Sequence, residues 1–335
     1  MNSLVVQTAF LGDVVLTTPL LAALAERLGP VDVVTTPAAA PLLETHPAVR
    51  QVIAYDKRGR DRGLAAFRTL TRRLAAAQYD VAYLPHRSLR TALLARMARV
   101  PRRVGFSDGW PLLYTESRER PKTGHEIDRL LSLVGATRDA HPVRLYPSPA
   151  DEQVVAEFLE GAGIGADFVA LAPGSIWGSK RWPYFPDLAR ELAARLPVVV
   201  VGGAEDTALG RAVVDGVAGT GGRAADACGR LTLRQSAALI GRARVLVTND
   251  SAPLHFASAF GTPVVALFGP TIPEFGFGPI GGGDVVLGVT GLSCRPCSDH
   301  GPPSCPLGHH RCMKELRVTT VLEGIEKTGA LRRRG

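Results

Sequence analysis

The chain has 335 residues, enough for two domains with substantial hydrophobic cores. Hydrophobic residues make up 46% and charged residues 21%, as in ordinary globular proteins, and no apolar run reaches the length of a membrane-spanning helix. The 39 lysines and arginines outnumber the 31 aspartates and glutamates, and the resulting net charge of +8 suits an anionic partner.

The positive charge is concentrated in the first half, where twelve arginines lie between Arg58 and Arg103. No helix-turn-helix, RNP-type strand or zinc-finger spacing accompanies them, so nucleic acid is not an expected partner. A phosphorylated acceptor at an anionic membrane surface fits the charge better, and solvated helix faces are the other interpretation. The first residues predict a β-strand rather than a signal peptide, which indicates a cytoplasmic location.

The first half alternates short apolar runs with helical periodicities. Strands are expected at residues 4–9, 31–35, 49–55 and 80–84, and helices at 14–28, 37–44, 64–77 and 88–99. Such βαβ repeats predict a doubly wound parallel sheet. Asp13, His86 and Arg87 follow strands, so we expect them to face one crevice, although Asp13 could be only the N-cap of its helix.

The second half repeats the pattern after a proline-rich linker at residues 139–150. Strands are expected at residues 168–171, 198–201, 245–247 and 264–268, and helices at 151–162, 185–195, 233–240 and 254–260. The predicted class is therefore α/β, with one domain over residues 1–145 and a second over 146–320. A last helix lies within 315–330, and the segment 321–335 is long enough to return to the first domain.

Two polar turns of the second half are candidate phosphate sites. Residues 172–183 combine glycines, hydroxyls and cations, including Ser175 and Lys180, without the spacing of a Walker A loop. Asp250 and Ser251 precede a buried helix whose N-terminus would attract a diphosphate, and capping that helix is their alternative role.

Four segments, read in order, resemble motifs of the heptosyltransferases of glycosyltransferase family nine. They are residues 10–19, 172–183, 248–271 and 294–313. The resemblance covers nearly the whole chain and implies a GT-B fold, in which two Rossmann-like domains face each other across a cleft. It also implies inverting transfer of heptose from ADP-heptose to the lipopolysaccharide inner core. The last segment resembles the tail of heptosyltransferase II, which favours addition of the second heptose.

The resemblance assigns chemistry to the first two segments. Asp13 would be the general base that deprotonates the acceptor hydroxyl, in a motif where many relatives carry serine and this chain carries Phe10. Lys180 would neutralise the departing diphosphate, with Ser175 a better phosphate contact than Ser179. His86 and Arg87 are candidate acceptor contacts, and for Trp182 we favour packing of the loop.

Donor-binding roles follow for the rest of the second half. Glu205 would bind ribose hydroxyls, and Leu231 is either an adenine contact or a core residue. The helix end at Asp250, Ser251 and Ala252 would hold the diphosphate, and His255 would support it or lie in the core. Because no Asp-x-Asp pair occurs, no divalent cation or other cofactor is expected beside the donor substrate, ADP-heptose.

Four cysteines cluster near the end of the chain, at Cys294, Cys297, Cys305 and Cys312. They are compatible with a structural zinc site, but a reduced, tightly packed loop is the favoured interpretation. 

Other functions remain open. A sugar-nucleotide epimerase of the same fold would need no acceptor, another family-nine enzyme would use a different acceptor, and a binding module would release no ADP. An oxidoreductase is disfavoured, since no Gly-x-Gly-x-x-Gly follows the first strand. The favoured enzyme acts on an anionic lipid-linked saccharide, in the cytoplasm or at the inner face of the inner membrane.

Overall fold

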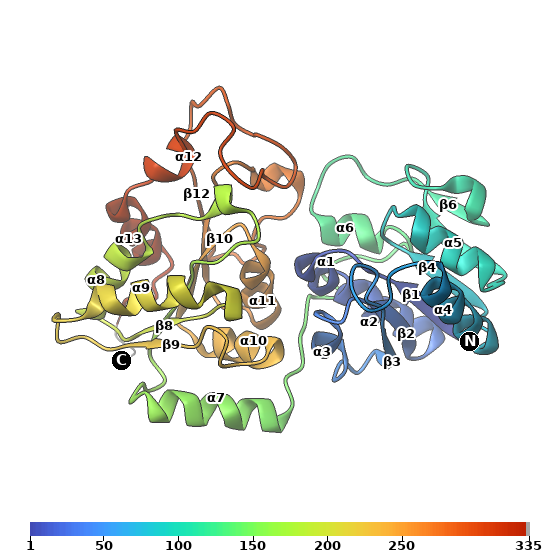
Figure 1. Cartoon of the computed structure of the whole chain (residues 1–335), viewed down its shortest axis with the longest axis horizontal. Coiled ribbons are helices and arrows are strands. Elements are labelled where there is room, and N and C mark those ends of the chain that lie inside the picture. Colours follow the sequence, from blue (N-terminus) through green and yellow to red (C-terminus); the bar gives the residue numbers. More distant parts are fainter. Residues whose placement is uncertain (333–335) are drawn as a thin grey trace. The chain divides into compact units, whose positions relative to one another are not determined.

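The structure is a computed structural model that describes residues 1–332. The chain divides into two compact units, the first covering Met1–Tyr146 and the second beginning at Pro147 (Figure 1). Each unit is an α/β fold built on one six-stranded sheet. Among the described residues, no helix is both long and apolar enough to cross a membrane.

The sheet of the first unit is entirely parallel and has the strand order β3-β2-β1-β4-β5-β6. Its strands are β1 (Ser3–Val6), β2 (Val31–Thr35), β3 (Val49–Ala54), β4 (Val81–Leu84), β5 (Arg102–Phe106) and β6 (Glu116–Arg118). Its helices are α1 (Leu11–Leu16), α2 (Thr18–Leu28), α3 (Ala40–Leu43), α4 (Leu64–Ala76), α5 (Leu89–Met97) and α6 (Glu126–Leu131), with a 3-10 turn η1 (Pro111–Leu113). From β1 the chain adds strands first on one side (β2, β3) and then on the other (β4, β5, β6), so the switch point lies between β1 and β4, where doubly wound sheets bind ligands.

The second unit repeats this topology with the order β12-β11-β10-β7-β8-β9, again all parallel. Its strands are β7 (Val169–Ala172), β8 (Val198–Val200), β9 (Ala224–Asp226), β10 (Val245–Asn249), β11 (Val264–Leu267) and β12 (Val285–Leu287). Its helices are α7 (Pro149–Gly161), α8 (Phe185–Ala193), α9 (Thr207–Val217), α10 (Leu233–Arg242), α11 (Ala252–Phe260), α12 (Arg311–Lys314) and α13 (Val318–Lys327). Three 3-10 turns, η2 (Gly178–Lys180), η3 (Ala204–Asp206) and η4 (Pro273–Phe275), follow β7, β8 and β11. The equivalent switch point here lies between β7 and β10.

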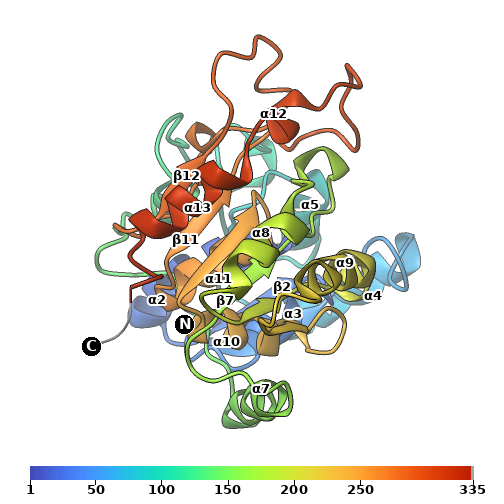
Figure 2. The ribbon, with the colours of Figure 1, turned by 90° about the vertical axis from the view of Figure 1, so that its left-hand side faces the viewer.

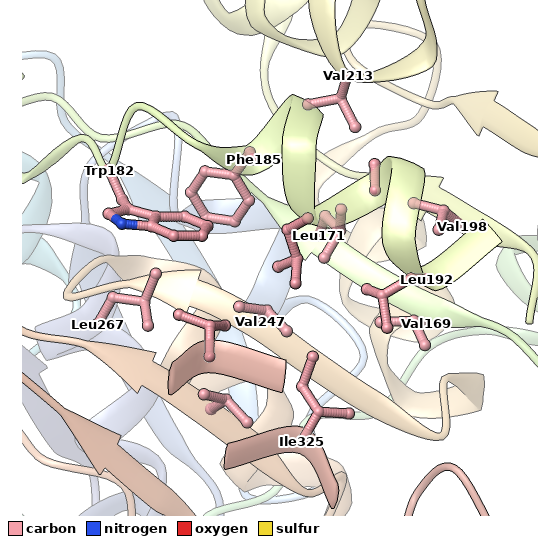
Figure 3. Packing of buried hydrophobic residues seen from close by; sticks show 14 of the residues in the cluster. Val169, Leu171, Trp182, Phe185, Leu192, Val198, Val213, Val247, Leu267 and Ile325 are labelled. Carbon is pink, nitrogen blue, oxygen red and sulfur yellow. The ribbon is translucent and has the colours of Figure 1, made fainter. Parts of the chain in front are cut away.

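The core of the second unit explains why its strands are continuous apolar runs. Strands buried on both faces by helices have no solvent face to carry polar residues. Alternate residues of β7 and β10, such as Val169 and Val247, pack against α8, α9 and α13 (Figures 2 and 3). Trp182 is 2% exposed in this core, and its indole N–H donates to the Leu316 carbonyl at 2.8 Å. The packing role favoured for Trp182 is what the structure shows.

The last helix belongs to the second unit. Val321 and Ile325 on α13 are fully buried against its sheet. The segment 321–335 was expected to be long enough to return to the first domain. Its residues 321–327 belong to α13 and pack in the core of the second unit, and residues 333–335 lie outside the described part of the chain.

One helix boundary differs from the expectation in a way that matters for the site. The helix expected over residues 14–28 is two helices, α1 and α2, which meet at Thr17. Pro19 lies in the first turn of α2, where a missing N–H costs no helical hydrogen bond. Helix α1 begins earlier, at Leu11, with Phe10 as its N-cap. Asp13 therefore lies inside the first turn and is not the N-cap.

Candidate functional site

Asp13 follows β1 at the switch point of the first unit. Its Oδ2 atom accepts a hydrogen bond from the Phe10 N–H at 3.0 Å, which aligns the carboxylate with the N-terminus of α1. Burial and the negative charge of Glu126 raise the pKa of Asp13 to about 6. The Phe10 N–H and the positive charge of Arg120 lower this pKa, but by less. Asp13 is thus a stronger base than an ordinary aspartate and is still mostly ionised at neutral pH.

A charged cluster that the sequence reasoning missed surrounds this aspartate. Glu126 opens α6, and its Oε2 accepts hydrogen bonds from Arg120 and, at 3.4 Å, from Arg129. All three side chains are largely buried, and the Arg120 guanidinium lies 5.6 Å from the centre of the Phe106 ring. A buried carboxylate held by two arginines near Asp13 places fixed charges of both signs beside the proposed base.

His125 is the N-cap of α6. Its Nδ1 accepts from the Ile127 N–H at 3.2 Å, so this histidine has a capping role at the start of the helix that carries Glu126.

His86 and Arg87 follow β4, the strand next to β1. Burial, with the positive charges of Lys57 and Arg87, lowers the pKa of His86 to about 4, so this imidazole is neutral at physiological pH. Its buried Nδ1 has no hydrogen-bond partner within residues 1–332. Arg87 is exposed and pairs with Asp108 at 3.0 Å. Lys57, anchored to Thr8 at the end of β1, is a further cation at this edge that sequence reasoning missed.

The second unit brings two of the sequence motifs into direct contact at its own switch point. Lys180 ends η2 after β7, and Asp250 follows β10, the neighbouring strand. The Lys180 Nζ lies 2.6 Å from Asp250 Oδ2, and the Thr271 hydroxyl donates to the same oxygen at 2.6 Å. Lys180 is only 7% exposed. The lysine and the aspartate that were expected to act separately form a buried ion pair, and we call these three residues the Lys180 triad.

A buried asparagine holds the Ala172–Pro183 loop over this triad. Asn249 donates to the Pro173 carbonyl at 2.8 Å and accepts from the Trp182 N–H at 3.1 Å. Ser175 lies in the same loop, where its hydroxyl accepts from the Trp177 N–H at 3.2 Å. Sequence reasoning did not single out Asn249, although a polar residue ending an apolar strand was the available signal.

Helix α11 begins beside the triad. Ser251 is its N-cap by backbone position, but no side-chain hydrogen bond caps the helix; the Ser251 hydroxyl lies 3.4 Å from the Asn249 carbonyl oxygen. Ala252 is the first helical residue, and His255 is 5% exposed within the helix. Asp250 thus serves Lys180 and Thr271 instead of capping α11.

Two acidic neighbours after β8 have different environments. Asp206 is buried, and its Oδ2 accepts from the Gly203 N–H at 3.2 Å; burial raises its pKa. A side chain at Gly174 would meet Asp206 Oδ2 at 2.3 Å, so this carboxylate packs directly under the Ala172–Pro183 loop. Glu205 is exposed, which leaves it available to a ligand. Leu231 is only partly buried and is not a core residue.

The cysteines are free thiols, with Cys312 buried and Cys297 exposed. Burial would raise the pKa of Cys305, but N–H groups of residues 307–310 outweigh it and lower that pKa. Within the described residues, no group of three or more His, Cys, Asp or Glu side chains is placed to hold a metal ion. The zinc alternative for Cys294, Cys297, Cys305 and Cys312 stays a prediction.

Comparison with known proteins gives a consistent result. A family model described as glycosyltransferase family 9 (heptosyltransferase) matches residues 67–305. The lipopolysaccharide heptosyltransferase 2 of Salmonella typhimurium is 26% identical over 312 residues, which cover 82% of this chain and 84% of that protein.

Solved structures agree on the fold. A glycosyl transferase of family 9 from Veillonella parvula superposes with a TM-score of 0.86 at 24% identity, covering 99% of this chain and 98% of that one. The E. coli heptosyltransferase WaaC with ADP superposes with a TM-score of 0.73 at 19% identity, covering 98% of this chain and 100% of that one. The predicted α/β class and the GT-B fold are confirmed.

Proposed function

The chain belongs to glycosyltransferase family 9, and on this basis we propose that it moves heptose from ADP-heptose to the lipopolysaccharide inner core. The observation that carries the proposal is Asp13, a carboxylate at a sheet switch point whose pKa of about 6 suits a general base at neutral pH. The likeness to a heptosyltransferase 2 and the cysteine-bearing tail favour the second heptose as the one added.

Asp13 acts on the acceptor. A sugar hydroxyl is a weak nucleophile until it loses its proton, and the Asp13 carboxylate takes that proton as the oxygen attacks the anomeric carbon of the donor. The new glycosidic bond forms as the bond to the diphosphate breaks on the opposite face, so the configuration at the anomeric carbon inverts. The proton ends on Asp13 and the electron pair of the broken bond on ADP.

The Lys180 triad and the first turn of α11 receive the leaving diphosphate. A lysine ammonium has three N–H donors, so Lys180 binds a phosphate oxygen while one N–H stays on Asp250. The N–H groups and dipole at Ser251 and Ala252 add positive potential at the same edge of the sheet. Together they supply the charge stabilisation that a divalent cation supplies elsewhere, and the proposed reaction needs no metal or other cofactor.

The remaining donor contacts are assigned by position. Ser175 in the Ala172–Pro183 loop contacts a phosphate, Glu205 binds the ribose hydroxyls, and Leu231 packs against the adenine. His255, a buried residue of α11, supports the first turn of that helix.

The acceptor meets the first unit. Arg87 and Lys57 give the edge near His86 positive charge, which suits the anionic groups of a lipid-linked inner-core saccharide. The net charge of +8 supports contact with the inner face of the inner membrane, where that acceptor would be reached from the cytoplasm.

The test measures ADP release from ADP-heptose, with and without a heptose-primed inner-core lipid, for the native chain and for Asp13→Asn. We expect acceptor-dependent release that the substitution lowers by at least about a hundredfold, because it removes the base but keeps an oxygen able to accept from the Phe10 N–H. Near-normal turnover by Asp13→Asn would remove Asp13 as the base. Conversion of ADP-heptose without acceptor would favour an epimerase. ADP release only with a different saccharide would identify that saccharide as the acceptor.

A further inference from the structure

The cysteine-bearing tail packs against the turn that carries Lys180. Residues within 301–310 contact η2, a single 3-10 turn. The His310 Nε2 lies 2.6 Å from the Ser179 carbonyl oxygen, and the Ser179 hydroxyl donates to the Pro302 carbonyl. A side chain at Gly178 would meet the Pro303 carbonyl oxygen at 2.6 Å, so tail and turn are in direct backbone contact.

The same segment also contacts the side chain of Lys180. A Cβ added at Gly301 would lie 3.1 Å from Lys180 Cε and 3.4 Å from Cγ. Gly301 has a φ of 80°, a left-handed backbone conformation that favours glycine. The tail backbone therefore runs along the aliphatic stem of the lysine, and its course helps set the direction of the ammonium group.

A second contact reaches the other side of the Lys180 triad. Arg295, beside Cys294, donates to the Thr271 carbonyl at 3.1 Å, and the Cys297 N–H donates to the Pro270 carbonyl at 2.8 Å. Thr271 is the residue whose hydroxyl shares Asp250 Oδ2 with Lys180. The tail thus holds residues on both sides of the lysine–aspartate pair.

The cysteines organise the tail itself. The His310 N–H donates to Cys305 Sγ at 3.4 Å, and Cys297 Sγ donates to the Cys294 carbonyl at 3.3 Å. His310 has a left-handed φ of 53° immediately before α12. Its backbone therefore turns sharply here, with the N–H directed at the Cys305 sulfur. This turn directs the imidazole towards η2.

We propose that the tail is a clamp for the catalytic lysine, with His310 and Arg295 as positioning residues that act through Ser179 and Thr271. A three-residue 3-10 turn has little stability of its own, so the position of Lys180 depends on what packs around it. A carbonyl oxygen can only accept, so His310 holds the Ser179 carbonyl with an Nε2–H, which both the neutral Nε2–H tautomer and the imidazolium provide. The inference rests on the proposed role of Lys180 at the donor diphosphate.

The test compares His310→Leu, which removes the donor, with His310→Gln, whose amide nitrogen can take the place of Nε2. The matched control is His309→Ala, since the His309 Nδ1 accepts from the Arg311 N–H within the tail itself. We expect His310→Leu to lower kcat by about tenfold to a hundredfold, as misplacement of a catalytic group does, and His310→Gln to recover most of the loss. ADP affinity, measured by calorimetry, is expected to fall with kcat, because Lys180 binds the same diphosphate.

A double-mutant cycle separates positioning from general damage. In a Lys180→Met background, His310→Leu is expected to cost almost nothing further, since the group that it positions is already gone. An equal loss in both backgrounds, or failure of His310→Gln to recover activity and ADP affinity, would refute the clamp. If instead Lys180→Met leaves heptose transfer intact, the proposed role of Lys180 fails, whereas the ADP measurements still decide whether His310 governs the diphosphate contact.

Discussion

At the scale of single residues, environment decides which carboxylates can do chemistry. Asp13 and Asp206 are both crowded by protein, and burial raises the pKa of each. The Asp206 carboxylate, however, accepts a hydrogen bond from the Gly203 N–H under a loop. The Asp250 carboxylate already accepts hydrogen bonds from Lys180 and Thr271. The Asp13 carboxylate accepts the Phe10 N–H on Oδ2 and has no side-chain cation bonded to it within residues 1–332, so it retains acceptor capacity for a substrate proton.

The pH dependence of transfer is expected to report the neighbours of Asp13. With a pKa of about 6, only about a tenth of Asp13 is ionised at pH 5, so activity should fall on the acid side. Glu126→Gln removes the negative charge that, after burial, raises this pKa. The acid limb of the kcat/KM profile should therefore move to lower pH, with little change at pH 7.5.

A suitable control for this shift is Glu119→Gln, at an exposed acid next to Arg120 in the sequence whose charge is not among those that shift the pKa of Asp13. An acid limb that stays in place in Glu126→Gln, or moves to higher pH, would contradict the assignment of Asp13 as the titrating base.

At the scale of elements, loops after parallel strands are held by the strands beside them. The Ala172–Pro183 loop follows β7, but its shape depends on Asn249 at the end of β10. One buried amide satisfies a carbonyl and an N–H that no helix or sheet ladder reaches, and buried backbone groups need such partners. The loop that carries Ser175 and Lys180 is therefore formed jointly by two neighbouring strands.

Asn249→Ala is expected to destabilise the second unit by about 2–4 kcal/mol, because it leaves the Pro173 carbonyl and the Trp182 N–H without this partner. Urea unfolding followed by tryptophan fluorescence measures the loss, since Trp177 and Trp182 both lie in this loop. Asn2→Ala, at a partly exposed asparagine of the first unit, serves as control and should cost less than about 1 kcal/mol. Equal losses in the two variants would show that Asn249 does not hold the loop.

At the scale of the whole molecule, the two units share one topology but carry different chemistry. Each has the same strand order and a switch point, β1/β4 in one and β7/β10 in the other. The first places a carboxylate and several cations at that edge, whereas the second places a lysine–aspartate pair and a helix N-terminus there. This division suits a reaction with two substrates, an acceptor that must lose a proton and a donor that must lose a diphosphate.

The excess positive charge predicts salt-dependent membrane contact. The native chain should co-sediment with vesicles that contain anionic lipid at low ionic strength and be released at about 0.5 M salt, where charges are screened within a few ångströms. Vesicles of neutral lipid alone are the control and should not retain it. Binding that persists in high salt, or that is equal on neutral vesicles, would show that the net charge does not drive the contact.

The sequence by itself determined the α/β class, the approximate strands and the residues that follow them, because apolar periodicity and turn residues are local signals. It pointed to Asp13, Ser175, Lys180 and Asp250 in this way, and the resemblance to the family added Glu205. Only the tertiary structure decided which of these side chains meet. Three features depend on contacts between residues far apart in the chain, which no local pattern records. They are the pairing of Lys180 with Asp250, the position of Glu126 near Asp13, and the packing of the tail on η2.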